Sequence, residues 1–264
     1  MFLIHLTWAS CALRAGDEQT CVAVARYFMR ERPYTTDCYR LFSTMCRLCR
    51  APSMWFSSSP AQKYILRQIR SRDEIVKQEA RDAGKDESTA VERLDTCLLI
   101  VYGHILFASM SYHFALNYYQ RALAVDPGNP VISLCIGLSY VHWALKRQAD
   151  NRQYLLTQGF HFLYRYADER LAAATASGDV HARREAYYNI GRAYHLLGLH
   201  ALAAEFYGKV LREADPNDEI EDAHRQKSSY PDLRTEAAYN LRTYYLLAGN
   251  HEAAMRIARA YLVV

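Results

Sequence analysis

The sequence contains no long apolar run, no large excess of charge and no catalytic motif. Its longest apolar stretches are far shorter than the roughly 20 residues needed to cross a bilayer. The apolar start, MFLIHLTWASCALRAG, lacks the positive segment of a secretory signal. The 32 lysines and arginines nearly balance the 28 aspartates and glutamates, leaving a net charge of only +4, so no long-range field marks a binder of nucleic acid or membrane. We expect a soluble, non-secreted protein.

Catalytic signatures are also missing. His195 and His200 are five residues apart with no HExxH motif around them, no glycine-rich loop is suited to phosphate, and no serine or cysteine lies in a nucleophile motif. The sequence therefore predicts a protein that is not an enzyme, with no catalytic residue and no cofactor.

The seven cysteines are an odd number and favour reduced, intracellular thiols. Cys46 and Cys49, with Cys38 upstream, have a spacing that can supply three zinc ligands. No second Cys or His pair follows at finger spacing, so small core residues are the better interpretation and no metal site is predicted.

Two segments, 95–130 and 179–217, share one pattern of small and large residues. The first carries Leu99, Tyr102, Gly103, Leu106, Ala115, Tyr119, Ala122 and Pro127; the second carries Tyr187, Ile190, Gly191, Tyr194, Ala203, Tyr207, Val210 and, one place late, Pro216. The pattern resembles the tetratricopeptide repeat (TPR), a helix-turn-helix unit of about 34 residues. The predicted fold is therefore all-α, a TPR-like solenoid of antiparallel helix pairs. Gly103 and Gly191 are expected to face Ala115 and Ala203, so that the two backbones approach closely.

Weaker copies extend the array in both directions. A copy near the end contains Ala254, and residues 1–72 hold degenerate pairs that include helices at 37–50 and 60–72. The charged segment 73–95 is either a mobile connection or a solvated helix. The main TPR block is 96–264, with a polar surface loop at 214–232 that has no apolar period to bury.

The repeat at 130–175 is expanded. Gly137 begins it in register, but Gly159 occupies the pairing alanine place about ten residues late. About ten helical residues add about 15 Å, and sharing them between the two helices would make a pair that projects past its neighbours. Asn151 is a candidate cap for the second helix, which is predicted to run through Leu171. A mid-helix glycine such as Gly159 indicates that another backbone passes close by. Two interpretations stay open: packing on the adjacent polar loops, or docking of a partner.

The segments ALKRQADNRQ and QGFHFLYRY, in the run from Asn129 to Tyr166, resemble the C-terminal TPR block of the repeat subunit of transcription factor TFIIIC, part of the RNA polymerase III machinery. The similarity extends from about Leu94 to the end and more loosely to the N-terminal pairs. It implies a nuclear, non-enzymatic scaffold that contacts other subunits of a TFIIIC-like complex, reaches DNA through that complex and helps to recruit TFIIIB. Family members are much longer, with an acidic N-terminal region and an earlier array, and functions of those parts do not carry over.

Both ends of the sequence are apolar. The segment 1–6 starts without a helix cap, and 261–264 does not form the polar closing helix that an exposed solenoid end needs. We expect the ends to contact other parts of a longer protein or a second copy.

In TPR proteins the second, fifth, ninth and twelfth places of each repeat line the concave groove. Here those places hold Cys97, Ile100, His104, Phe107; Val131, Leu134, Leu138, Val141; Glu185, Tyr188, Arg192, His195; and Glu236, Tyr239, Thr243, Leu246. The groove candidates that we select for partner binding are His104, Phe107, Leu134, Leu138, Tyr188, Arg192, His195 and Tyr239. Covering of Val131 and Leu134 by the chain's own long helix is an equal alternative. Asn189 and Asn240 stand where chaperone-binding repeats hold a terminal carboxylate, but the neighbouring basic residues of such sites are missing.

Nucleic-acid binding is the alternative function. Basic residues gather in the N-terminal pairs beside aromatic ones: Arg40, Arg47, Arg50, Lys63, Arg67, Arg70 and Arg72, with Tyr39, Trp55 and Tyr64. Such a patch suits phosphates and stacked bases, whereas an ordinary solvated basic face is the simpler interpretation.

Overall fold

The computed structural model describes residues 59–84, 96–146, 149–213 and 233–262, together with ten single residues between Ile4 and Val24. These residues form helices, and none of them lies in a strand. The predicted all-α class is therefore confirmed. The chain divides into two compact units, Met1–Ile132 and Ser133–Val264.

The first unit contains α5 (Ser59–Asp82), α6 (Thr96–Ala108) and α7 (Tyr112–Val125). Helices α6 and α7 pack together as a pair and bury Leu99 and Tyr119 to 1% exposure. Arg121 of α7 holds both carboxylate oxygens of Asp73 on α5 at 2.7 Å. Both hydrogen bonds come from the single nitrogen Nη2 of Arg121, and this ion pair joins α5 to the α6–α7 pair.

Helix α5 is longer than the predicted 60–72 segment, because it continues to Asp82 through the charged stretch. Ile69, Val76 and Ala80 are all buried, and their spacing of seven and eleven residues places them on one face of the helix. The sequence of this stretch is mostly polar, but the helix still has a narrow line of buried apolar residues along one face. Residues 85–95 and the predicted helix 37–50 lie outside the described residues.

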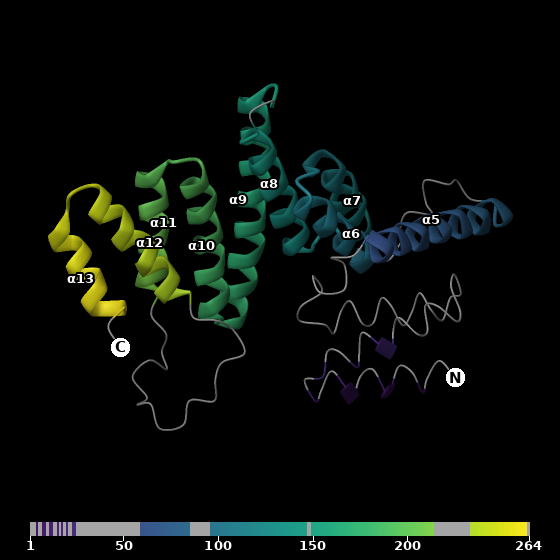
Figure 1. Cartoon of the computed structure of the whole chain (residues 1–264), viewed down its shortest axis with the longest axis horizontal. Helices are drawn as coiled ribbons and strands as arrows, with labels where there is room; N and C mark the ends of the chain where they lie inside the picture. The colour runs from purple at the N-terminus through teal and green to yellow at the C-terminus, as the bar shows by residue number, and fades with distance from the viewer. Residues whose placement is uncertain are drawn as a thin grey trace. The chain divides into compact units, whose positions relative to one another are not determined.

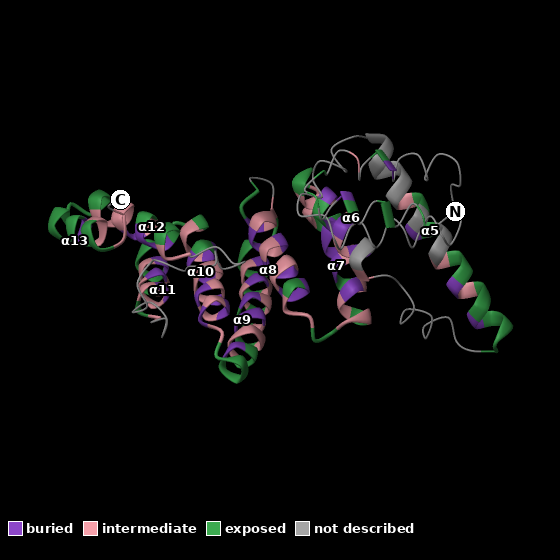
Figure 2. Cartoon of the chain, turned by 90° about the horizontal axis from the view of Figure 1, so that it is seen from below, coloured by how far each residue is buried: buried purple, intermediate pink, exposed green. Residues whose placement is uncertain are grey.

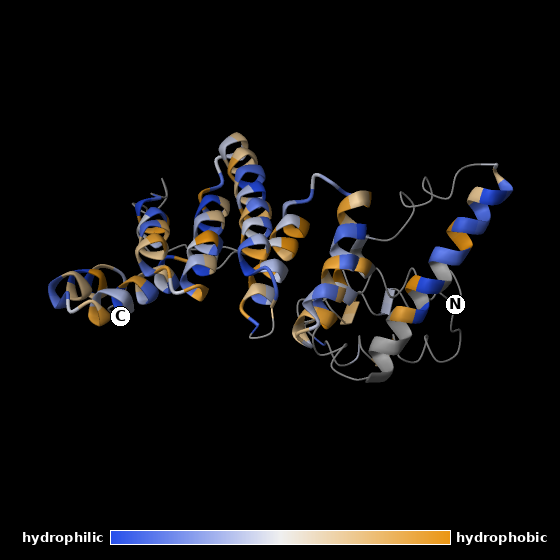
Figure 3. Ribbon diagram, turned by 90° about the horizontal axis from the view of Figure 1, so that it is seen from above, coloured by the Kyte–Doolittle hydropathy of each residue, from blue (hydrophilic) through white to orange (hydrophobic). Residues whose placement is uncertain are grey.

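The second unit contains three helix pairs: α8 (Pro130–Ala144) with α9 (Arg152–Ser177), α10 (Val180–Leu196) with α11 (His200–Arg212), and α12 (Arg234–Leu247) with α13 (His251–Tyr261) (Figure 1). Apolar and polar residues alternate along these helices (Figure 3). Each helix thus carries apolar residues that a neighbouring helix must cover, which is the physical basis of a stacked repeat.

The turns inside the second and third of these pairs have the same geometry. Gly198 and Gly249 adopt φ values of 73° and 74°. The following N–H groups, of Leu199 and Asn250, return to the carbonyls of Tyr194 and Tyr245 at 3.0 and 2.8 Å. This closing pattern requires the left-handed backbone that glycine adopts without strain, so the turns are encoded locally.

The expansion of the 130–175 repeat lies in one helix only. Helix α8 has 15 residues and ends at Ala144, whereas α9 has 26 residues and runs to Ser177, twice the 13 residues of α11. Our expectation that both helices share the extra length is wrong, because the polar segment after Leu145 offers no apolar side chain to extend the buried stripe of α8. The difference corresponds to roughly 20 Å of helix, and the tip of this pair extends beyond the turn of the neighbouring α10–α11 pair (Figure 1).

Asn151 occupies the N-cap position of α9 but does not cap it with its side chain. Its backbone is left-handed, with φ 51° and ψ 46°, and no side-chain cap hydrogen bond is formed. The predicted position is therefore right and the predicted capping is wrong.

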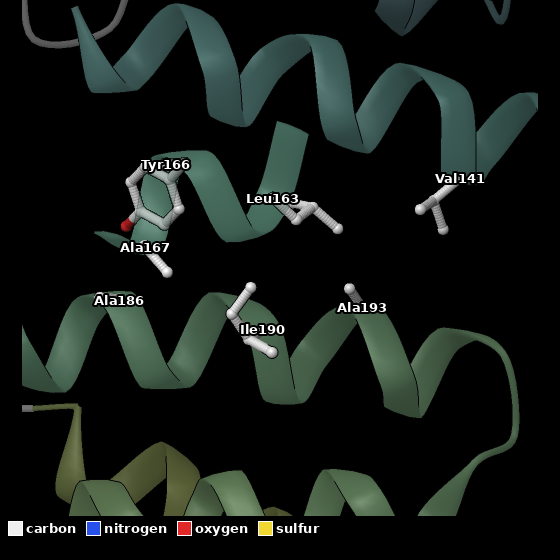
Figure 4. Close-up of a cluster of buried hydrophobic side chains, with 7 residues drawn as sticks. All are labelled: Val141, Leu163, Tyr166, Ala167, Ala186, Ile190 and Ala193. Carbon is white, nitrogen blue, oxygen red and sulfur yellow. The ribbon is translucent and has the colours of Figure 1, made fainter. Parts of the chain in front are cut away.

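The core of the second unit lies where α8, α9 and α10 meet. Val141 comes from α8, Leu163, Tyr166 and Ala167 from α9, and Ala186, Ile190 and Ala193 from α10 (Figure 4). Buried residues recur along α9 and α10 and alternate with exposed ones (Figure 2). The long helix α9 therefore connects two successive first helices.

Candidate interaction face

In the α6–α7 and α10–α11 pairs the two helices approach at a glycine, but the contact partner of this glycine differs from the predicted one. A Cβ added to Gly103 or Gly191 would meet the ring of Tyr119 or Tyr207, at 3.1 Å in the latter case, before it met the alanine four residues earlier. Ala115 and Ala203 are buried nearby. The close approach exists because a flat tyrosine ring lies over the glycine, and the alanine leaves room for that ring.

The expanded pair brings two backbones together. A Cβ on Gly137 would lie 2.9 Å from the carbonyl oxygen of Gly159 and 2.7 Å from Cγ of Leu163. The close backbone inferred from the mid-helix Gly159 is therefore that of α8. Of the other repeat-defining residues, Ala122 and Ala254 are buried to 1% exposure or less.

Polar groups at the helix interfaces satisfy the hydroxyls of the buried tyrosines. His104 Nδ1 lies 2.7 Å from the Tyr119 hydroxyl. The Tyr166 hydroxyl donates to Glu185 at 2.9 Å and accepts from Asn189 at 2.9 Å. Burying a hydroxyl without a partner would be costly, so these polar residues have a packing role.

Asn189 and Asn240 have this same role. Asn189 donates a hydrogen bond to the Tyr166 hydroxyl, and Asn240 lies close enough to Tyr207 to lower the pKa of its hydroxyl against the overall rise caused by burial. The two asparagines are occupied by tyrosines of the preceding helix pair, which agrees with rejecting a carboxylate clamp of the chaperone-binding kind.

Several predicted groove residues pack within their own unit. Phe107 meets Tyr112 edge-on at 5.2 Å between ring centroids. Leu134 and Leu138 are half-buried against the cluster formed by α9 and α10. The prediction that Val141 lines the groove is wrong, because its side chain is fully buried. Its Cγ2 atom lies 2.9 Å from where a Cβ atom on Gly159 would be. Cys97 belongs to α6, but its side chain lies outside the described residues.

The remaining candidates on α10 come together beside Tyr207 of α11. Tyr188, Arg192 and His195 repeat at helical spacing on α10 and converge on Tyr207 of α11: the Tyr188 ring lies 5.8 Å from it, and His195 Nδ1 lies 3.1 Å from its hydroxyl. The Tyr239 ring, on α12, is 60% exposed and takes no part in these contacts.

Three further residues belong to this surface and were missed as binding candidates. His200, the first residue of α11, lies 5.5 Å from His195 and 6.1 Å from Tyr244 of α12, measured between ring centroids. His142 of α8 lies close enough to Arg192 for the guanidinium to affect its pKa. We define the Arg192 face by its members Tyr188, Arg192, His195, His142, His200 and Tyr244. The four groove places of each repeat all lie on its first helix, so they could not identify His200, which lies on a second helix.

Electrostatics on the Arg192 face disfavour added positive charge. Burial lowers the pKa of His142, and Arg192 lowers it further. Burial also lowers the pKa of His195, with additional contributions from His200 and Arg192. Both imidazoles are therefore neutral at pH 7, and each can use a ring N–H as a hydrogen-bond donor.

Other sequence candidates contribute no chemistry in the structure. Burial raises the pKa of the Cys135 thiol to about 12, so this residue is a packed, protonated side chain. No three His, Cys, Asp or Glu side chains of the described ranges form a metal-binding group. None of the described helices has both the length and the apolar character needed to span a membrane.

Only part of the basic N-terminal set can be located. Arg67 and Arg70 are exposed on α5. Lys63 and Arg72 belong to α5, but their side chains lie outside the described residues. Arg40, Arg47, Arg50, the three N-terminal cysteines of the zinc hypothesis and the loop 214–232 also lie outside them.

These features define the class of protein: an all-α repeat protein of the tetratricopeptide type, built from helix pairs, three of which approach closely at a glycine. A tetratricopeptide repeat protein from Parabacteroides merdae is among the similar solved structures, with a TM-score of 0.46 and 13% identity over 99% of this chain and 93% of that chain. No protein-family model matches the chain.

Curated relatives are more specific. The chain is 34% identical to transcription factor tau subunit sfc4 of Schizosaccharomyces pombe and 30% identical to the transcription factor tau 131 kDa subunit of Saccharomyces cerevisiae, covering 98% and 96% of this chain. Human general transcription factor 3C polypeptide 3 is 35% identical over 62% of it. The chain spans about a quarter of the length of the two fungal relatives, 26% and 23%.

The chain thus belongs to the family of the TFIIIC repeat subunit, as a segment homologous to part of these transcription factor subunits along nearly all of its length. The resemblance drawn from the expanded repeat is confirmed.

Proposed function

We propose that this chain is a non-enzymatic protein-interaction scaffold in a TFIIIC-like complex of the RNA polymerase III initiation machinery. It holds other subunits of that complex, contacts DNA indirectly through them, helps to recruit TFIIIB and acts in the nucleus. The observation that carries this proposal is the 34% identity over 98% of the chain to a transcription factor tau subunit.

The Arg192 face supports the proposal as a contact surface. It combines an exposed arginine with the aromatic rings of Tyr188 and Tyr244, and arginine and tyrosine are enriched where partner proteins bind most strongly. Tyr239, exposed on α12, extends the candidate surface along the next helix pair.

The test is capture of nuclear proteins on the immobilised chain, quantified by mass spectrometry. We expect recovery of TFIIIC subunits by the unaltered chain and loss of that recovery when Arg192→Ala and Tyr239→Ala are combined. Recovery of heat-shock chaperones or splicing proteins in place of polymerase III factors would overturn the proposal. Recovery of TFIIIC subunits unaffected by the double substitution would remove this surface from it.

Self-association through apolar ends is a separate part of the proposal. Light scattering across a concentration series distinguishes it: growth in mass with concentration supports it, and a constant monomer mass contradicts it.

Nucleic-acid binding through α5 is the second candidate function. Burial raises the pKa values of Tyr102 and Tyr118, and Arg70 is near enough to oppose this rise. The two rings meet edge-on, with 4.7 Å between their centroids. A cation beside paired aromatic rings suits an exposed base and its phosphate. An electrophoretic mobility shift with DNA or RNA at increasing salt concentrations tests this function. Strong, salt-sensitive affinity that falls with Arg67→Ala and Arg70→Ala favours nucleic-acid binding, and lack of binding favours the scaffold function alone.

A further inference from the structure

Arg192 lies on the helix pairs of the second unit beside arginines that are held by carboxylates, but it has no carboxylate partner itself among the described residues. Arg170 pairs with Glu185 at 2.7 Å, Arg183 with Glu213 at 2.7 Å, and Arg165 with Glu169 at 2.8 Å. Among the described residues, Arg192 is exposed and makes no such pair. Its electrostatic neighbours are His142, His195 and Tyr207. A fixed positive charge is thus presented to solvent with hydrogen-bond donors beside it.

The surroundings of Arg192 are aromatic and held in place. The His195 imidazole is fixed by Tyr207 at 3.1 Å. His200 and Tyr244 continue the line of rings from α11 to α12 at 6.1 Å, and Tyr244 meets Tyr245 at 5.7 Å. Rings fixed by packing lose little conformational entropy on binding, so the face is prepared for a ligand.

The acidic residues of α10 and α12 lie toward the N-terminal ends of these helices, and Glu205 of α11 pairs with Lys209 at 3.0 Å. Glu185, seven residues before Arg192 and so about two turns away along α10, forms an ion pair with Arg170 and accepts a hydrogen bond from Tyr166. Glu236 is exposed in the first turn of α12. The positive charge of the face is therefore confined to its end near the α10–α11 turn, where His195 and His200 lie.

A single fixed cation flanked by neutral imidazoles is poorly suited to a nucleic-acid backbone, which is bound by neutralising several phosphates at once. It is well suited to one or two carboxylates. A guanidinium can hold a carboxylate with two parallel hydrogen bonds, and the nearby rings can cover an apolar side chain of the same segment.

We propose that the Arg192 face binds an acidic peptide segment of a partner protein, with a carboxylate on the guanidinium of Arg192 and an aromatic or aliphatic side chain beside Tyr188 and Tyr244. This inference rests on the proposed scaffold function and names the chemistry of its partner. The acidic residue lies toward the α10–α11 turn, and the apolar residue lies toward α12.

The probe is a random peptide library displayed on phage and selected on the full chain. We expect peptides enriched in Asp and Glu next to an aromatic or aliphatic residue. Arg192→Glu should abolish this enrichment or replace it by Lys and Arg. For a selected peptide, Arg192→Ala should weaken binding by about tenfold to hundredfold, the effect of removing one hydrogen-bonded charge pair.

Arg256→Glu is the matched control. Arg256 is exposed on α13, outside the Arg192 face, and the substitution changes the net charge equally, so selection on it should equal that on the unaltered chain. Thermal unfolding followed by circular dichroism shows whether the Arg192→Glu chain remains folded; a conservative Arg192→Gln variant serves if it does not.

Two outcomes would overturn the proposal of an acidic partner segment without contradicting the scaffold function. One is selection of neutral apolar peptides whose binding depends on Tyr188 and Tyr239 but not on Arg192. The other is acidic peptides that bind Arg192→Glu and the unaltered chain alike. Failure to select any peptide would overturn the inference and leave the scaffold function, which is tested separately by the capture of TFIIIC subunits. Salt-sensitive binding of polyuridylate that is lost with Arg192→Glu would assign the face to nucleic acid.

Discussion

At Gly137 the helices α8 and α9 meet backbone to backbone, and at Gly191 a tyrosine ring fills the same place. Both contacts depend on a missing Cβ atom, but they differ in what the atom would strike. A carbonyl oxygen of a packed helix cannot move aside, whereas the end of a flexible side chain can. The cost of replacing a glycine therefore depends on its neighbour, and only the structure identifies that neighbour.

Gly137→Ala should destabilise the protein. The new Cβ would lie 2.7 Å from Cγ of Leu163 and 2.9 Å from the carbonyl oxygen of Gly159. We expect a loss of about 1–3 kcal/mol in the free energy of unfolding, because overpacking outweighs the gain of about 1 kcal/mol in helix propensity. Urea denaturation measures the change.

Gly208→Ala is the control for that substitution. Its Cβ would approach only the guanidinium end of Arg212, at 3.3 Å, so stability should be unchanged or rise by up to about 1 kcal/mol. Equal effects of the two alanines on unfolding would contradict the proposed backbone contact.

The glycine contacts also show what the sequence pattern could not predict. The spacing of Gly103, Gly191 and the small residues after them was enough to predict the helix pairs. It was not enough to identify the tyrosine ring as the contact, because pattern matching compares positions, whereas contact depends on how far a side chain reaches.

At the scale of elements, α9 joins its neighbours by two kinds of contact. Leu163 packs toward α8, and Tyr166 and Arg170 bind Glu185 of α10. One helix thus serves two interfaces along its length, which is why it needs 26 residues. The sequence showed that an insertion existed, but its allocation to α9 alone follows from which side chains find partners.

Tyr166→Phe should weaken the α9–α10 interface. It removes the hydroxyl that donates to Glu185 and accepts from Asn189, leaving a half-buried amide and a carboxylate oxygen with fewer partners. We expect a loss of about 1–3 kcal/mol in thermal or chemical unfolding.

Tyr164→Phe provides the matched comparison on the same helix. Its hydroxyl bonds that of Tyr194 at 2.8 Å on the surface, where the residue is 41% exposed and water can replace the bond. A change within about 0.5 kcal/mol is expected. If both phenylalanines had the same effect, the polar network around Tyr166 would not be a stabilising contact.

In an array of helix pairs, the stability of each helix depends mainly on its contacts with the neighbouring helices. Leu241 of α12 belongs to a cluster with Ala203, Tyr207 and Val210 of α11, while the α8–α9–α10 cluster contains other residues. In such an array the stability is approximately a sum of repeat and nearest-neighbour contributions.

Leu241→Ala should therefore loosen one end of the second unit. The side chain is 4% exposed, and its truncation should cost about 2–5 kcal/mol locally. Hydrogen exchange followed by mass spectrometry should show faster exchange in α11, α12 and α13, with protection in α8 and α9 little changed. Uniform acceleration across all six helices would show that the unit unfolds as one cooperative body.

The sequence by itself determined the all-α repeat class, the helix pairs, the presence of the expanded repeat and the family, because each of these is a property of spacing along the chain. Tertiary structure decided which residues of the repeats meet solvent. Val141 and His195 hold the same place in successive repeats, yet Val141 is buried against Gly159 while His195 joins the Arg192 face. Exposure depends on the length and side chains of the neighbouring helix, and no local pattern contains that information.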